Sequence, residues 1–135
     1  MRLLIDANIV LDVLERREPY WTDSSKVWKL CETELAEGTI TTLTFANLVY
    51  VMRKELDPEQ IRDVLKKLQL IFRFVDLTAA DLEKAAEMRW ADFEDAIQAA
   101  AAERIAADAI ITRNVRDFRN SKVIAFTPAE LLARL

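Results

Sequence analysis

Five short apolar segments, separated by longer stretches of helical periodicity, constrain the fold of this chain more than any other feature. Each has the length of a strand, and the second is rich in β-branched residues. The five segments are residues 2–6, 39–43, 72–76, 108–112 and 122–126. Strands that alternate with helices are typical of a parallel sheet covered by helices on both faces. The sequence therefore predicts an α/β fold with a central parallel sheet of about five strands.

The stretches between the strands predict helices, and prolines and a glycine indicate where several of them begin or end. The helices are expected over residues 8–17, 20–37, 44–56, 58–71, 81–90, 93–107 and 128–135. Pro58 and Pro128 stand at first-turn positions, and Gly38 is expected to end the second helix. The alanines at 99–102 would let the sixth helix approach a sheet closely. With 135 residues, the chain is expected to form one domain, residues 1–135.

The residue types that are absent limit the chemistry more than those that are present. The chain has no histidine, which excludes a Ser-His-Asp triad, a Cys-His pair and a histidine-bound metal. Its single glycine excludes a P-loop and a dinucleotide-binding turn, and its single cysteine excludes a disulfide framework. Carboxylates, amides, hydroxyls and basic side chains remain. An enzyme of this composition would most naturally use a hard cation such as Mg²⁺ or Mn²⁺.

Charge and hydropathy bound the location of the protein and its partners. No apolar run approaches the length of a membrane span, and Asp6 interrupts the first apolar segment too early for a signal peptide. Cys31 is expected to be a small core residue on a helix, in a reducing cytoplasm. The net charge of −4 would repel nucleic acid on average, so any binding of nucleic acid must be local or bridged by metal.

Polar side chains gather where two of the predicted strands end and where one predicted helix begins. They are Asp6 after the first strand, Thr112, Asn114 and Asp117 after the fourth, and Asp92 and Asp95 at the helix start. Asp92 and Asp95 are three residues apart and therefore share one face of that helix. Taken singly, each acid has a plainer explanation, as a helix cap, a first-turn acid or an exposed turn acid.

The combination of these acids favours a metal site. In a doubly wound sheet the first and fourth strands can be neighbours, and ligands bind at the carboxyl ends of the strands. Asp6, Asp95 and Asp117 would then converge on one crevice. A fold tolerates clustered carboxylates mainly when a cation neutralises them. The sequence therefore predicts a divalent metal at this edge of the sheet, with Asn8 orienting the carboxylate of Asp6.

Three motifs resemble the acidic motifs of the PIN-domain family, small metal-dependent nucleases that include the VapC-type toxins of bacterial toxin–antitoxin pairs. They are DANIVLD at residues 6–12, FEDAIQAA at 93–100 and ITRNVRDF at 111–118, and the resemblance extends over the whole chain. It implies an endoribonuclease that depends on Mg²⁺ or Mn²⁺ and cleaves single-stranded RNA. Two positions depart from the family pattern, because Asn47 and Asn114 stand where many relatives carry an acid.

The resemblance implies a role for each acid of the cluster. Asp6 and Asp95 would bind the metal directly or through its waters, and Asp117 would complete the negative cluster. Asp92 and Asp117 would compensate for the missing acids. Asn114 would position a carboxylate or a water by hydrogen bonding.

The polar and basic residues around the acids are candidates for substrate binding. Thr112, Asn8 and Asn47 would act by hydrogen bonding, with Asn47 as a weak ligand or a neighbour of the ligands. Arg113 and Arg116, together with Arg119, would hold RNA phosphates. The alternative for these arginines is a solvated turn.

The partners and two alternative functions remain open at this point. The predicted helices at 44–56 and 58–71 carry a surplus of apolar residues, which could form a homodimer interface or a groove for an antitoxin helix. VapC-type relatives use both. One alternative is a catalytically weakened PIN domain that acts as an RNA- or protein-binding module. The other is a structural α/β domain whose acids only cap helices.

Overall fold

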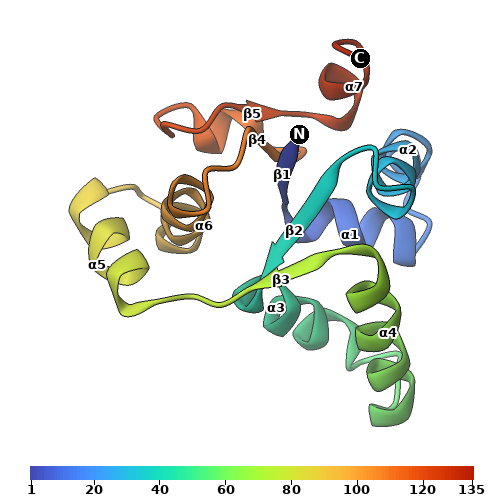
Figure 1. The fold of residues 1–135 in the computed structure, drawn as a ribbon. Helices are drawn as coiled ribbons and strands as arrows, with labels where there is room; N and C mark the ends of the chain where they lie inside the picture. The colour runs from blue at the N-terminus through green and yellow to red at the C-terminus, as the bar shows by residue number, and fades with distance from the viewer.

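A parallel sheet of five strands organises the fold, in the order β3-β2-β1-β4-β5 (Figure 1). The computed structural model describes residues 1–135. The strands are β1 (Arg2–Ile5), β2 (Glu37–Thr41), β3 (Arg73–Val75), β4 (Ala109–Ile111) and β5 (Ala125–Phe126). All neighbouring pairs are parallel. The predicted α/β fold with a five-stranded parallel sheet is therefore confirmed.

Seven α-helices and one 3-10 turn connect and cover the strands. They are α1 (Ala7–Leu14), α2 (Trp21–Glu32), α3 (Thr42–Met52), α4 (Pro58–Ile71), α5 (Ala79–Met88), α6 (Phe93–Arg104), α7 (Pro128–Leu132) and the 3-10 turn η1 (Val115–Phe118). Figure 1 shows α1, α2 and α4 on one side of the sheet, and α5 and α6 on the other. The structure contains no helix with the length and apolar character that crossing a membrane requires.

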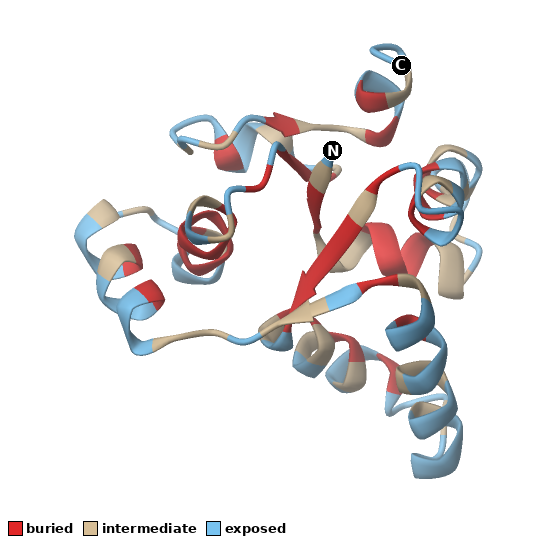
Figure 2. Cartoon of the chain, in the orientation of Figure 1, coloured by how far each residue is buried: buried red, intermediate tan, exposed pale blue.

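The central strand β1 is buried on both faces, and its alternating side chains contribute to two different cores. Leu3 and Ile5 belong to the larger core, which is built with residues of α1, α2, α3 and α4. Leu4 points to the opposite face and packs with Ala99 and Ala102 of α6. Figure 2 shows buried residues concentrated along the central strands and in α6. This alternation with a period of two fixes which side of β1 faces which helix layer.

Small side chains bring α6 close to the sheet, as the run of alanines predicts. The residues of α6 from Ala96 to Ala102 are all buried, and α5 packs against the outer side of this helix. Because α6 begins beside the sheet's carboxyl edge, its first turn is held firmly at that edge. The same packing therefore fixes the position of Asp95.

The prediction that Gly38 ends the second helix is wrong. Helix α2 ends at Glu32, and Gly38 lies within β2, where it pairs with Leu3. A Cβ atom at this position would lie 2.5 Å from the Sγ of Cys31 and 2.8 Å from the Cδ1 of Phe72. Glycine is required here because two side chains pack directly against the strand backbone. Cys31 itself is buried on α2, as expected.

The boundary between the second strand and the third helix also differs from the prediction. Strand β2 covers Glu37–Thr41 rather than 39–43, and α3 begins at Thr42 rather than at 44. Thr41 is the reason, because its hydroxyl accepts a hydrogen bond from the backbone N–H of Thr44 and caps the helix. A threonine can end a strand and cap a helix, and β-branched residues alone do not distinguish the two.

We expect Gly38→Ala to destabilise the protein. The added methyl group must displace Cys31 or Phe72, which costs about 1–3 kcal/mol in a packed core. Urea unfolding of Gly38→Ala and of the double variant with Cys31→Ala measures the effect. Removing the sulfur atom should recover part of the loss, so the two substitutions should not be additive. Unchanged stability of Gly38→Ala would show that this contact can relax freely.

Candidate functional site

The pairing of β1 with β4 creates the centre of the site. Ile5 is in register with Ile111, so the next residues, Asp6 and Thr112, lie side by side at the carboxyl edge. The backbone N–H of Asp6 donates to the Ile111 carbonyl at 2.9 Å. The Thr112 hydroxyl donates to Oδ2 of Asp6 at 2.8 Å. The prediction that the first and fourth strands are neighbours is confirmed.

Asp6 is both a helix cap and a member of the acid cluster. Its Oδ1 accepts the backbone N–H of Ala7 at 2.8 Å, at the start of α1. The amide of Asn8 lies at the longer distance of 3.5 Å from Oδ2. Burial raises the pKa of Asp6, and the charge of Asp117 adds to this, while the bonds from Thr112 and Ala7 oppose it. The cap explanation is therefore correct but incomplete, because a cap needs no neighbouring carboxylates.

The first turn of α6 brings three more acids to the same edge. Asp92 caps the helix, because its Oδ1 accepts the backbone N–H of Asp95 at 3.0 Å. Burial, followed by the charges of Asp92, Asp6, Asp117 and Glu94, raises the pKa of Asp95 to about 7. The groups that act on the pKa of Asp95 are all carboxylates, and no basic side chain is among them. A cation is what such a cluster lacks.

The fourth strand leads into a loop that carries the remaining candidate acid. Asn114 donates its backbone N–H to the Thr112 hydroxyl at 3.0 Å, and η1 follows directly. Asp117 lies in this turn with an exposed side chain. Asn114 is also exposed, and its side chain makes no hydrogen bond. Thr112 thus connects the loop with Asp6.

The acids fit a divalent cation in chemistry, although they do not form a finished metal site. No group of three acidic side chains converges closely enough on one point to hold an ion. The donors are carboxylate and amide oxygens, which suit Mg²⁺ or Mn²⁺ and no softer metal. Mg²⁺ usually keeps several waters and takes only one or two protein carboxylates directly. Asp6 and Asp95 as direct ligands, with the other acids acting through water, agree with this preference.

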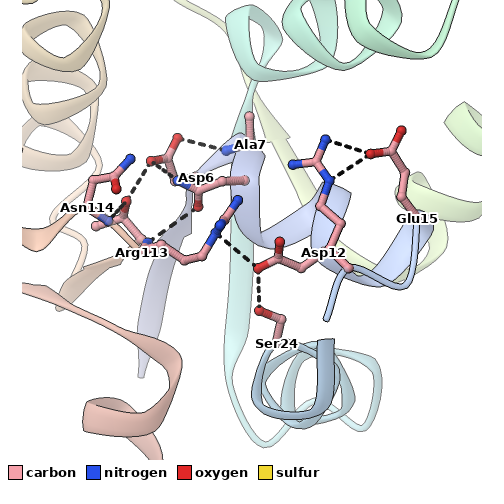
Figure 3. Close-up of polar contacts among 10 residues, drawn as sticks. Asp6, Ala7, Asp12, Glu15, Ser24, Arg113 and Asn114 are labelled. Carbon is pink, nitrogen blue, oxygen red and sulfur yellow. Dashed lines mark hydrogen bonds and ion pairs between the residues drawn. The ribbon is translucent and has the colours of Figure 1, made fainter. Parts of the chain in front are cut away.

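The side chain of Arg113 points to Asp12 of α1, away from the carboxylate of Asp6 (Figure 3). Its Nε is 3.4 Å from Oδ2 of the fully buried Asp12, and its guanidinium stacks on the ring of Tyr20. Ser24 donates its hydroxyl to the same Asp12 oxygen at 3.0 Å, and the backbone N–H of Arg113 reaches Asn8 at 3.4 Å. The structure therefore gives Arg113 a role in joining the 112–114 loop to α1 and α2, which differs from the phosphate contact that the sequence suggested.

Asn47 lies at the border of the cluster, on α3. Its Nδ2 is 3.5 Å from Oε2 of Glu94, the residue next to Asp95. The helix after β2 therefore faces the first turn of α6, as the sequence interpretation requires. A carboxylate at position 47 would stand directly beside the acids.

A groove of about 740 Å³ opens from the acid cluster. Asp92, Asp95 and Asp117 line its inner end, and Arg116 lies on its wall. Arg113 is absent from its lining. Of the three arginines proposed for phosphate binding, Arg116 and Arg119 line this groove and Arg113 does not. The site thus consists of an acid cluster and an adjoining groove with basic side chains.

Three functional residues were missed in the sequence. Glu94 contributes to the acid cluster, but the periodicity of its helix does not show that its first turn faces Asn47. Asp12 contacts Arg113, and Ser24 on a different helix donates a hydrogen bond to Asp12. One signal could have found Asp12, because an isolated acid between the apolar residues of α1 needs a cation when it is buried.

Comparison with known proteins identifies the family. A sequence profile described as PIN domain matches residues 2–116, so the chain belongs to the PIN-domain family. No curated protein matches the chain. The fold resembles that of toxin–antitoxin proteins whose structures are solved.

Three solved structures illustrate this similarity. VapBC2 from Rickettsia felis, bound to a DNA fragment from its promoter, has a TM-score of 0.68 at 19% identity, covering 94% of this chain and 98% of that one. A toxin–antitoxin complex from Klebsiella pneumoniae has a TM-score of 0.73 at 21% identity, covering 93% and 97%. VapBC-1 from nontypeable Haemophilus influenzae has a TM-score of 0.73 at 17% identity, covering 96% and 99%. At these identities the similarity shows a shared fold.

We expect Asp95→Asn to make the stability of the metal-free protein less dependent on pH. The pKa of Asp95 is raised from 3.8 to about 7 on folding. The folded state therefore binds the proton more tightly than the unfolded state. Its stabilising effect is complete below about pH 4 and is lost as the pH rises through about 7. Wild type should accordingly lose stability between about pH 5 and pH 8, and Asp95→Asn should lose less.

Urea unfolding in a chelator at both pH values measures this difference. Asp63→Asn, on the exposed surface of α4, is the matched control and should keep the wild-type pH dependence. The same slope in wild type and Asp95→Asn would show that Asp95 keeps its ordinary pKa in the folded protein.

Proposed function

We propose that this protein is a metal-dependent endoribonuclease that cleaves single-stranded RNA, and that it is the toxin of a toxin–antitoxin pair. The observation that carries the proposal is the acid cluster at the β1–β4 edge, where burial and neighbouring carboxylates raise the pKa of Asp95 to about 7. Membership of the PIN-domain family supports nuclease chemistry at this edge. The similarity in fold to toxin–antitoxin complexes supports the biological role.

The residues of the site divide the work of phosphodiester hydrolysis. Asp6 and Asp95 would hold Mg²⁺ or Mn²⁺, which supplies an activated water and stabilises negative charge on the scissile phosphate. Thr112 holds Asp6 by donating its hydroxyl, and Asn8 supports the same carboxylate. Asp117 adds negative charge beside Asp95, which would strengthen the binding of the cation. The chain itself offers no histidine for acid–base catalysis.

A second candidate function is an RNA- or protein-binding module with weak catalysis. Asn47 and Asn114 favour it, because amides bind Mg²⁺ less well than carboxylates do. Asn47 lies beside Glu94 at the border of the acid cluster. The cluster therefore carries one negative charge fewer than it would with a carboxylate at position 47. Metal-dependent cleavage distinguishes the two functions.

The partners of the proposed toxin are a cognate antitoxin and a second copy of the chain, in the cytoplasm. Large apolar side chains remain exposed on the helical pair α3–α4, with Tyr50 61% and Leu70 88% accessible. Leu48, Met52 and Leu68 of the same pair are buried, so most of its apolar residues do serve the core. The exposed remainder supports a homodimer interface or an antitoxin contact, which sedimentation and co-expression would test.

We expect Asp6→Asn and Asp95→Ala to abolish cleavage of single-stranded RNA. Each substitution removes a charged oxygen ligand, and a loss of at least about 100-fold is expected, since even residues behind metal ligands contribute about 10–100-fold. Asparagine at position 6 can still cap α1, so Asp6→Asn should keep its fold. The assay follows RNA cleavage with Mg²⁺ and with Mn²⁺, and Asp63→Asn is the control. A wild-type protein that cuts no RNA with either metal would favour the binding module.

We expect Asn47→Glu to tighten metal binding and to destabilise the metal-free protein. The new carboxylate would stand beside Glu94 and Asp95, where it adds both repulsion and a hard oxygen donor. Calorimetric titration of Mn²⁺, together with urea unfolding in a chelator, measures both effects. Asn47→Gln has the same length without the charge and should show neither. Equal metal affinity in all three proteins would exclude position 47 from the site.

A further inference from the structure

The arginines of this protein fall into two groups by their contacts. Eight of the twelve pair with a carboxylate or stack on an aromatic ring. The other four have no such partner and make no side-chain hydrogen bond: Arg62, Arg89, Arg116 and Arg119. Three of these four, all except Arg62, line the groove that opens from the acid cluster. Unpartnered arginines are thus concentrated at one place on the surface.

The groove is elongated and extends away from the acid cluster. One wall is the α5–α6 connection with Arg89 and Trp90, and the other is η1 and the residues after it, with Arg116 and Arg119. Asp95 and Glu103 of α6 both line it, eight residues apart, which is about 12 Å along a helix. The groove is therefore longer than a single phosphate or carboxylate ligand requires.

Glu103 neutralises the basic residues at the outer end. Its Oε1 contacts Nζ of Lys84 at 2.6 Å and Nζ of Lys122 at 3.7 Å. Lys84 belongs to α5, and Lys122 follows η1, so this one carboxylate bridges the two walls. Outside the acid cluster the lining holds five basic side chains and two acids, Glu87 and Glu103, so it keeps a net positive charge to which the three arginines contribute.

We propose that this groove binds the RNA strand that flanks the scissile phosphate, with Arg89, Arg116 and Arg119 as contacts to successive phosphates. The proposal rests on the proposed function, because the acid cluster at the inner end marks the cleaved bond. Guanidinium groups without internal partners are free to pair with phosphate oxygens. Trp90 adds an apolar ring in the lining, next to Phe118, on which a base can stack.

An RNA strand suits this groove better than a protein segment does. The net charge of −4 disfavours polyanions on average, so RNA binding requires a local set of unpaired basic side chains such as these arginines. A repeating anion matches several arginines along one track.

The binding test uses a short single-stranded RNA in a chelator, which prevents cleavage, and measures affinity over a range of salt concentrations. Arg89→Ala, Arg116→Ala and Arg119→Ala should each weaken binding. Each should also reduce the salt slope, log K against log salt, by about 0.7, the value for one lost contact to a single strand. Arg62→Ala on α4 is the matched control, because Arg62 is equally unpartnered but lies outside the groove, and it should bind like wild type. None of these side chains has an internal partner, so melting temperatures should not change.

Glu103→Gln provides a test in the opposite direction. The substitution frees Lys84 and Lys122, so this variant should bind RNA more tightly than wild type and with a steeper salt dependence. Wild-type affinity in Glu103→Gln, or equal affinity in Arg62→Ala and the three groove variants, would overturn the proposal. Failure of the wild-type protein to bind RNA would also overturn it.

The same variants separate this proposal from the proposed nuclease activity. Arginine-dependent binding by a protein that cleaves no RNA would support the groove and remove the nuclease function. Metal-dependent cleavage with an unchanged KM in all three arginine variants would retain the nuclease and remove the groove. Loss of affinity for a co-expressed protein partner, with RNA binding intact, would assign the groove to that partner instead.

Discussion

The parallel pairing of β1 with β4 is the interaction on which the rest of the site depends. The register that places Ile5 beside Ile111 also places Asp6 beside Thr112. Packing protects this register, because Leu3 and Ile5 fill one core while Leu4 fills the other. A shift of one residue would turn every side chain of β1 to the wrong face. The position of the carboxylate is thus set by apolar residues that never touch it.

A buried polar network holds the other half of the site in the same indirect way. Gln98 of α6 donates to the hydroxyl of Thr44 at 2.8 Å and accepts from Thr41 at 3.1 Å. This network ties α6 to the end of β2 and to the start of α3. Asp95 lies one turn before Gln98, and Asn47 lies one turn after Thr44. The network therefore also sets the positions of Asp95 and Asn47. Buried groups of this kind must be fully paired, which leaves little freedom in how the helices meet.

The sequence predicted the strands, the parallel sheet and the edge at which the acids gather, because these depend on periodicity and on general rules of topology. It did not predict what depends on distant contacts. In the sequence, Gly38 resembles a residue that ends a helix. In the structure it lies in a strand, and the side chains of Cys31 and Phe72 pack against it. In the sequence, Arg113 resembles a phosphate ligand. In the structure its side chain contacts the buried Asp12 of α1. Both errors concern residues whose partners lie on other secondary-structure elements and are brought into contact only by the tertiary fold.

The acids and the free arginines lie close together without neutralising one another, and the local geometry of η1 explains how. In a 3-10 turn, side chains three residues apart lie on the same side, which places Arg116 and Arg119 together. Asp117, one position after Arg116, is rotated by about a third of a turn, so it is presented in a different direction. Its charge reaches Asp6 and Asp95 and raises the pKa of both. The turn η1 and its C-cap Arg119 thereby supply a carboxylate to one part of the site and two guanidinium groups to the other.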